Sequence, residues 1–291
     1  KYATDWKTGY VCAAKATGMD LQFASNATYD MTNYGTGFTG LSGRYYSNAC
    51  ASTYYGADRD RIVPLIACIN GNGSKLVLSS NVQQYSDDDY FLQSWGGLFS
   101  AVAFTSAHAS TSVQNNGDYV VKDLQFGDAG KQSSVSLQCI KGSEDSDSKD
   151  ISDLGVGLLA GATANRDSLG SSGKYGNVSV VNCTVKSPSM AGGLLGNSGW
   201  ASRRTDTDNR SSMIDFNSDK VQASSLRLFN CSYEQLTVEG ASRVGGFVGA
   251  LGSGSDSGIW VTDDDIVVGQ SSTIRATADN CVVGGAFGIS W

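Results

Sequence analysis

Short apolar stretches separated by polar turn residues dominate the hydrophobic pattern of this chain. The stretches either alternate apolar and polar residues or are apolar throughout, and clusters of Gly, Asn, Asp and Ser bound them. This pattern is typical of β-strands joined by turns, and blocks of helix-forming residues are missing. We therefore expect an all-β protein with strand-like stretches at residues 62–69, 119–126, 135–140, 178–185 and 226–233.

A glycine-rich motif follows these stretches five times. It combines small and apolar residues, and reads WGGLFS, VGLLAG, AGGLLG, VGGFVG and VGGAFG at residues 95–100, 156–161, 191–196, 244–249 and 283–288. An internal repeat of this kind indicates an array of stacked units. The pattern predicts a parallel β-helix, in which glycines occupy corners where the backbone angles or close stacking exclude other residues.

The first part of the chain does not repeat and is rich in Tyr, Gly and Asn. We interpret residues 1–60 as an irregular N-terminal cap and residues 61–291 as the β-helix repeats. A solenoid needs such a cap because an uncovered end exposes apolar surface and unpaired strand edges. The start at Lys1 and the end just after a motif suggest a mature product or a piece of something longer.

Cysteines precede several of the motifs at similar places. Asn182-Cys183 and Asn230-Cys231, together with Cys139, predict a stacked ladder of equivalent residues. We expect these three cysteines to be small buried hydrophobes rather than disulfide partners. The first three cysteines of the chain could hold one disulfide; they are Cys12, Cys50 and Cys68.

Residues 70–78 read NGNGSKLVL and precede a Gly-Gly-Leu-Phe motif, and this arrangement resembles the opening coil of GLUG-repeat proteins. The later units, with a strand, Asn-Cys and Gly-Gly-Leu-Leu-Gly, resemble the repeats themselves. The resemblance implies a right-handed β-helix in a secreted or cell-wall-anchored bacterial protein, a group that includes adhesins. It also implies an extracellular, cell-surface location, and it supplies no catalytic residues.

The net charge of the chain limits the classes of partner that we expect. The 291 residues carry a formal net charge of −7. An acidic surface does not attract phosphate backbones or anionic lipids, so nucleic acids and membrane surfaces are not expected partners. Membrane insertion is not expected either, because the chain lacks an apolar run of the roughly 18 residues that a span requires. The expected partner is a glycan or a host or neighbour-cell surface protein, with self-association through open β-helix ends as a further option.

Aromatic residues near polar stretches are candidates for ligand binding, because aromatic rings stack on the apolar faces of sugars. We select Tyr45 and Tyr46 from the cap region, and Trp200 and Trp260 from the repeats. Packing of the cap and loops against the rest of the protein is the alternative role for these rings.

Grouped carboxylates are candidates for binding calcium, a cation that prefers oxygen ligands. The groups contain Asp87, Asp88, Asp89, Asp263 and Asp265, without the spacing of an EF-hand loop. No other cofactor is expected. A solvated run of charge at a loop is the alternative interpretation of each group.

We expect a non-catalytic extracellular adhesin or stalk segment of a larger bacterial surface protein. The single histidine, His108, lies between alanines and has no nucleophile signature beside it. Two alternatives stay open. One is a polysaccharide-cleaving β-helix enzyme that uses loop carboxylates as acid and base, and the other is a subunit of a self-assembling extracellular filament.

Overall fold

The computed structural model describes residues 19–32, 65–85, 95–105, 119–140, 154–166, 173–198, 226–251, 259–261, 266–269 and 271–289. Within these ranges the protein is all-β with almost no helix, as the sequence predicted. The strands form one 17-stranded sheet and one five-stranded sheet. Neighbouring strands run parallel, so the chain must return to the same end of the sheet between them.

The strands of the larger sheet are β1 (Met19–Gln22), β2 (Thr28–Asp30), β3 (Leu65–Val77), β4 (Ser79–Tyr85), β6 (Phe99–Thr105), β7 (Val121–Phe126), β8 (Ser133–Ile140), β10 (Ala160–Arg166), β11 (Gly173–Lys186), β13 (Leu195–Ser198), β14 (Leu226–Phe229), β15 (Cys231–Gly240), β17 (Val248–Leu251), β18 (Ile259–Val261), β19 (Ile266–Val268), β20 (Thr273–Ala276) and β22 (Phe287–Ile289). The smaller sheet contains β5 (Trp95–Gly96), β9 (Gly155–Gly157), β12 (Met190–Gly192), β16 (Arg243–Gly245) and β21 (Val282–Gly284).

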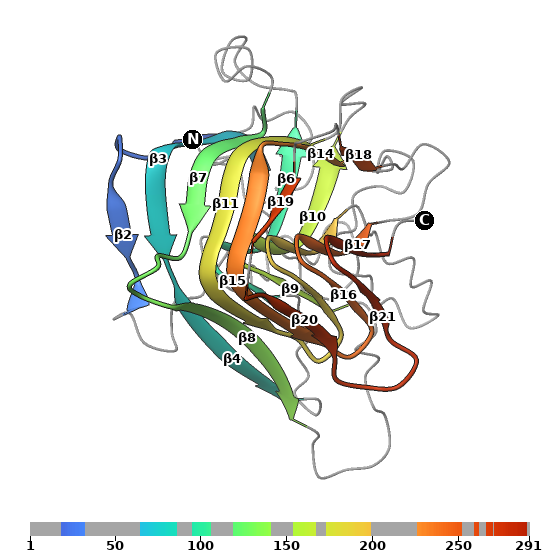
Figure 1. Ribbon diagram of the computed structural model, residues 1–291. Helices are drawn as coiled ribbons and strands as arrows, with labels where there is room; N and C mark the ends of the chain where they lie inside the picture. The colour runs from blue at the N-terminus through green and yellow to red at the C-terminus, as the bar shows by residue number, and fades with distance from the viewer. Residues whose placement is uncertain are drawn as a thin grey trace, which may run out of the picture.

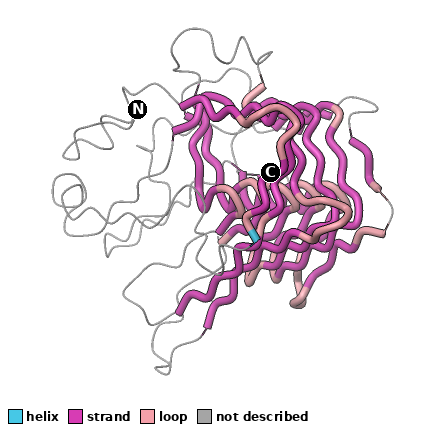
Figure 2. The backbone as a smooth tube through the Cα atoms, turned by 90° about the vertical axis from the view of Figure 1, so that its left-hand side faces the viewer, coloured by secondary structure: helices cyan, strands magenta, loops and turns pink. Residues whose placement is uncertain are grey.

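We call each turn of the chain through the two sheets a pass. Successive passes lie side by side in the larger sheet. Figure 1 shows β2, β3, β7, β11 and β15 next to one another in chain order, and Figure 2 shows the same stacking from the side. One continuous ladder connects Ile69, Val121, Tyr175, Leu228 and Val261 through directly paired positions. Residues at equivalent places in successive passes are therefore neighbours in space.

The five-stranded sheet is built from the starts of the five glycine motifs. Its ladder joins Trp95, Val156, Ala191, Val244 and Val283, which are the first residues of the five motifs. The repeat seen in the sequence is thus a row of adjacent parallel strands. The register also places Leu158 of the second motif where the other four motifs carry their second glycine.

The two glycines of a motif are required for different reasons. A Cβ atom on Gly192 would lie 2.0 Å from the carbonyl oxygen of Leu195 in the same motif, so the first glycine permits a tight turn. A Cβ atom on Gly193 would lie 2.1 Å from the carbonyl oxygen of Gly246, so the second glycine permits close stacking on the next motif. Two reasons for the motif glycines were expected from the sequence, unusual backbone angles and close stacking. Close stacking is the reason that applies, because the described glycines with left-handed backbone angles are Gly73 and Gly127, which lie outside the motifs.

Asparagine and aspartate take the left-handed corners instead. Asp123, Asn177 and Asn230 have φ angles of 52°, 53° and 50°. Asn230 donates from Nδ2 to Oδ1 of Asn177, and Asn177 donates from Nδ2 to Oδ1 of Asp123, each at 2.7 Å. Short polar side chains tolerate this conformation better than apolar ones do. The corners therefore form a hydrogen-bonded row along the stack.

The predicted ladder of Asn-Cys pairs is wrong in its register. Cys183 pairs with Ser133 on one side and with Leu236 on the other, rather than with Cys231. The reason is that this part of the chain has two left-handed corners in each pass, at Asn177 and Asn182 in β11. The Asn-Cys pair at 182–183 belongs to the second corner, whereas the pair at 230–231 belongs to the first.

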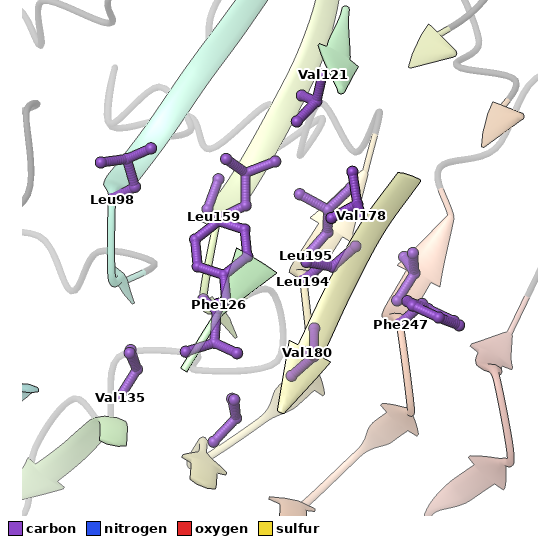
Figure 3. Close-up of a cluster of buried hydrophobic side chains, with 14 of the residues drawn as sticks. Leu98, Val121, Phe126, Val135, Leu159, Val178, Val180, Leu194, Leu195 and Phe247 are labelled. Atoms are coloured by element: carbon purple, nitrogen blue, oxygen red, sulfur yellow. The ribbon is translucent and has the colours of Figure 1, made fainter. Parts of the chain in front are cut away.

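The core lies between the stacked passes and consists of aliphatic and aromatic side chains. Figure 3 shows Phe126 and Leu159 from one pass, Leu194 from the next and Phe247 from the one after it, all in this core. Cys183 and Cys231 are buried in this core and are not disulfide-bonded, as predicted. Cys139 is also not disulfide-bonded, as predicted, but its predicted burial is only partial, because it packs against the core from a half-buried position. Cys68 is also free and buried, while Cys12 and Cys50 lie outside the described residues.

The parallel sheet begins inside the segment interpreted as a cap. β1 and β2 both belong to residues 1–60, and both pair in parallel with β3. They cover one edge of β3, which is the task expected of a cap. The part of this segment that the structure describes contributes strands rather than irregular structure alone.

Candidate functional site

Most residues selected from the sequence lie outside the described part of the chain. These residues are Tyr45, Tyr46, Trp200, Asp87, Asp88, Asp89, Asp263 and Asp265. His108 also lies outside it. Trp260 is the selected residue whose backbone is placed: it lies in β18, where it pairs with Arg227 of β14.

The neighbours of Trp260 form two rows on one face of the larger sheet. The first row runs from Lys174 through Arg227 to Trp260, and the second contains Gly176 and Phe229. Between these rows lies the ladder that contains Tyr175 and Leu228, whose side chains are buried in the core. Because successive residues of a strand point to opposite faces, the side chains of Lys174, Arg227 and Phe229 lie on the face away from the core.

Two aromatic rings and a lysine meet on this face. The ring of Tyr119 packs over Gly176, where a Cβ atom would lie 2.4 Å from the ring. Tyr119 meets Phe229 edge to face, with ring centroids 6.0 Å apart. The ammonium of Lys174 lies 4.3 Å from the centroid of Tyr119 and 5.0 Å from that of Phe229. We call Tyr119, Lys174, Arg227 and Phe229 the outer-face cluster; all four side chains are half-buried.

Sequence reasoning missed the residues of the outer-face cluster. Tyr119, Lys174 and Phe229 come from three separate passes of the chain, so no local motif connects them. The sequence held one signal, an equal spacing along the chain: Tyr119 and Lys174 are separated by as many residues as Lys174 and Phe229. Such a spacing is expected for residues at similar places in successive passes. Only the register of β7, β11 and β14 shows that this separation makes them neighbours.

Positive charge gathers around the cluster in an acidic protein. Lys122 of β7 pairs with Gly176 of β11, so three basic residues stand on three adjacent strands. Lys122 makes a long ion pair of 3.9 Å with Asp123, whose other oxygen accepts the hydrogen bond from Asn177. Within the described ranges, no carboxylate lies within ion-pair distance of Lys174, and its ammonium contacts the two rings instead.

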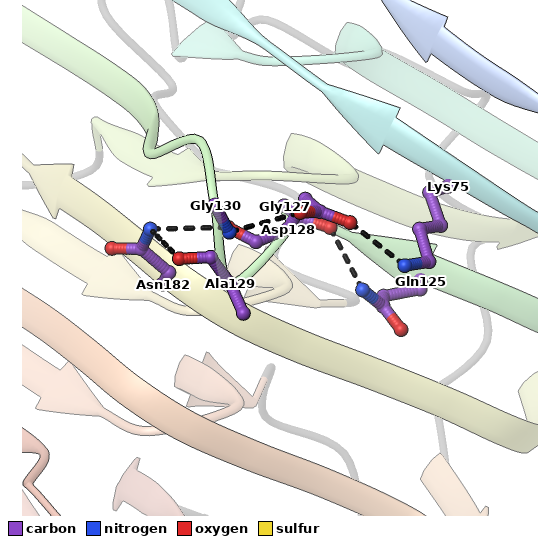
Figure 4. Close-up of polar contacts among 7 residues, drawn as sticks. All are labelled: Lys75, Gln125, Gly127, Asp128, Ala129, Gly130 and Asn182. Carbon is purple, nitrogen blue, oxygen red and sulfur yellow. Dashed lines mark hydrogen bonds and ion pairs between the residues drawn. The ribbon is translucent and has the colours of Figure 1, made fainter.

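Other carboxylates of the described chain are held by basic partners at corners. Figure 4 shows the loop at residues 127–130, where Lys75 Nζ lies 2.7 Å from Oδ2 of Asp128. Asn182 donates from Nδ2 to the carbonyl oxygens of Asp128 and Ala129, at 3.0 Å and 3.3 Å. The hydrogen bond from Lys75 lowers the pKa of Asp128. This loop thereby ties three passes of the chain together, a structural role.

Two further carboxylates are paired in the same way. Lys131 and Thr32 donate hydrogen bonds to Asp30, and these bonds lower the pKa of Asp30 to about 2. Glu239 is bonded by Arg275 at 2.5 Å and lies 3.3 Å from Lys186. The partial burial of Glu239 raises its pKa, but the two basic partners outweigh this effect and leave the pKa lowered.

Cys68 and Cys183 do not resemble activated nucleophiles. Burial raises the pKa of Cys68 to about 12, with a further contribution from Asp20, and burial also raises that of Cys183 to about 12. A reactive cysteine needs a lowered pKa, since the thiolate is the nucleophile. Among the residues that the structure places, no group of three or more His, Cys, Asp or Glu side chains could hold a metal ion.

Comparison with protein-family models, curated protein sequences and solved structures found no match. The described part of the chain also contains no helix that is long and apolar enough to cross a membrane. The outer-face cluster is therefore characterised by its own geometry: an ammonium that contacts two aromatic rings, with a second basic residue on the adjacent strand.

Proposed function

We propose that the chain is a right-handed parallel β-helix of the GLUG-repeat kind, acting as a non-catalytic adhesin or stalk segment of a larger extracellular bacterial protein. The observation that carries this proposal is the ladder of five motif strands, from Trp95 to Val283. Passes that stack in register form an extended, rigid body, which suits a stalk that holds a binding surface away from a cell.

A binding role is supported by the outer-face cluster. Sites on strands are held more precisely than sites on loops, and aromatic rings are the usual platforms for sugars. The cluster lies beside the backbone position of Trp260, a residue that the sequence selected independently. A glycan, or a glycan-bearing protein of a host or neighbouring cell, is the proposed ligand class.

A glycan-array measurement with the full chain tests this function, run beside a screen for polysaccharide degradation. Binding without turnover supports the adhesin. Saturable cleavage of a polysaccharide would instead support the enzyme alternative, with loop carboxylates as acid and base. If the chain neither binds nor cleaves any glycan on the array, the proposed glycan ligand is contradicted and only the stalk role remains.

Self-association is a second candidate function, favoured by the open edge at β21. Val282 and Val283 are each 43% exposed on this strand. Val283 occupies the motif position at which Val156, Ala191 and Val244 are fully buried. A strand added by a second copy of the chain would cover it.

Sedimentation over a range of concentrations tests self-association. The wild-type chain should show a concentration-dependent increase in mass, and Val283→Lys should abolish it. Thr277→Lys, at an already exposed polar position near the same end, is the matched control. A mass that stays monomeric at every concentration would rule out this second candidate.

A further inference from the structure

The C-terminal end of the stack carries apolar side chains that the core does not cover. Ile274 of β20 pairs with Val238 of the preceding pass. Phe287 of β22 pairs with Val248 of that pass. Val238 and Val248 are buried, whereas Ile274 and Phe287 are only half-buried. On the strand between β20 and β22 in the chain, Val283 is 43% exposed. The core therefore ends on a surface whose equivalents one pass earlier are covered.

The two edges of the smaller sheet differ in their exposure. Its edge strands are β21 and β5, and Figure 1 shows β21 outermost, beyond β16. At the β5 edge, residues 95–99 are all buried, the glycines included. At the β21 edge, Val282 and Val283 are each 43% exposed. An exposed edge strand presents unpaired backbone groups to a further strand, and a buried one does not.

This difference determines how a second copy of the chain can bind. In a head-to-tail stack, the β21 edge of one copy would have to pair with the β5 edge of the next, and that edge is buried. Two copies can instead bring their β21 edges together about a twofold axis, so that the same residues meet from both sides. Contacts of this symmetry are the commonest in soluble homo-oligomers, and they close at two copies.

The charge of this end permits contact between two acidic chains. The net charge of −7 makes two copies repel each other in general. Residues 271–289, however, contain one basic residue, Arg275, and one acidic residue, Asp279, so this stretch is formally neutral. Charges further away are screened over about 8 Å at physiological ionic strength. Apolar contact at β21 therefore meets little electrostatic opposition.

We propose that two copies of the chain pair antiparallel through β21, about a twofold axis at its middle residue Val283, and form a closed dimer. This inference rests on the self-association proposed above and adds the partner surface and the stoichiometry. The pairing extends the smaller sheet across both copies and covers the apolar end of each core. It is incompatible with a filament, because a closed contact leaves no β21 edge for a third copy.

Sedimentation equilibrium of the wild-type chain tests the stoichiometry. The mass should rise with concentration and level off at two copies. Growth beyond two copies would overturn the twofold contact but leave self-association standing. A monomeric mass at every concentration would contradict both the dimer and the self-association beneath it.

Opposite charges at Val283 test the position of the axis. Val283→Lys and Val283→Glu each place two like charges side by side at the axis, so each variant alone should be monomeric. An equimolar mixture should dimerise at least about tenfold more tightly than either variant, because opposite charges then face each other. Thr277→Lys and Thr277→Glu, at an exposed position outside β21, should each dimerise as the wild type does. A mixture that stays monomeric, although circular dichroism shows both variants folded, would overturn the axis at Val283.

Hydrogen exchange of the wild-type chain requires no substitution and distinguishes the two ends of the stack. As the concentration rises, the amides of β21 should exchange more slowly, whereas those of β2 at the other end should not change. Slower exchange at both ends would favour a head-to-tail stack and overturn the twofold pairing. Unchanged exchange at β21, at concentrations where the mass has doubled, would place the contact elsewhere and overturn it as well.

Discussion

Ser189 and Ser242 are 53 residues apart in sequence, yet their hydroxyl oxygens lie 3.0 Å apart. Each serine comes directly before a motif strand, β12 or β16, and these two strands pair in register. The short distance therefore follows from the stacking of one glycine motif on the next. The same stacking determines which glycines are indispensable and which corners need asparagine.

Gly193, the second glycine of the third motif, should be indispensable because the next motif stacks closely on it. Gly193→Ala brings a Cβ atom within 2.1 Å of the carbonyl oxygen of Gly246, and we expect an unfolding free energy lower by about 2–3 kcal/mol. Gly285 has the same place in the last motif, where the nearest atom is the Tyr233 hydroxyl at 4.0 Å. Gly285→Ala should change stability by less than about 0.5 kcal/mol. Urea denaturation measures both, and equal losses would contradict the stacking.

The free energy of unfolding should depend on which small residue occupies the left-handed corner at Asn177. Asn177→Ala loses two side-chain hydrogen bonds and places a Cβ atom at φ 53°, so we expect a loss of about 1–3 kcal/mol. Asn177→Gly loses the same bonds but relieves the backbone strain, and it should cost less than Asn177→Ala. Ser179→Ala, two residues further along β11, is the control for a neighbouring position. A glycine variant less stable than the alanine variant would contradict the assigned corner geometry.

Glu239 should make the stability of the fold depend on pH in the acidic range. Its pKa is lowered in the folded state, so the unfolded chain binds the proton at higher pH than the folded one does. The stabilisation is present above the ordinary carboxyl pKa and is lost as the pH falls through the lowered value. Glu239→Gln should flatten this slope and cost about 1–3 kcal/mol at neutral pH.

Thermal unfolding from pH 7 to pH 3 measures the effect of Glu239. The control is Glu234→Gln, because Glu234 is exposed on the same strand and makes no ion pair in the described part of the chain. Parallel pH profiles for wild type and Glu239→Gln would show that the contacts with Arg275 and Lys186 do not stabilise the fold.

Local patterns were enough to predict strands, turns and the row of motifs. The apolar stretch that became β11 and the motif at Ala191 both follow from alternation and repetition. The register could not be predicted, because two similar corners occur in one pass, and Asn182 could be confused with Asn177. The outer-face cluster was missed for a related reason: Tyr119 and Phe229 become neighbours only once the length of each pass is known.

The candidate ligand-binding and calcium-binding residues were selected on composition rather than on a repeated pattern. Tyr45 and Tyr46 were selected from the cap region, and Trp200 and the two groups of aspartates from the repeat region; in both places the sequence gives composition but no partner. Their proposed roles in ligand and calcium binding stay predictions. Trp260 was selected on the same grounds, and its backbone lies beside Arg227 because β18 continues the ladder of β14.

The stacking of successive motifs is the central claim, and a cross-link between Ser189 and Ser242 tests it most directly. Neighbouring strand positions meet the distance requirement for a disulfide, with Cα atoms about 4.4–6.8 Å apart. Under mild oxidation, Ser189→Cys/Ser242→Cys should form a bond between these two positions, identified by mass spectrometry of the digested chain. Ser179→Cys/Ser242→Cys, in which Ser179 pairs instead with Ser232, should not form it. A cross-link in the second pair but not in the first would contradict the register, and with it the proposed β-helix.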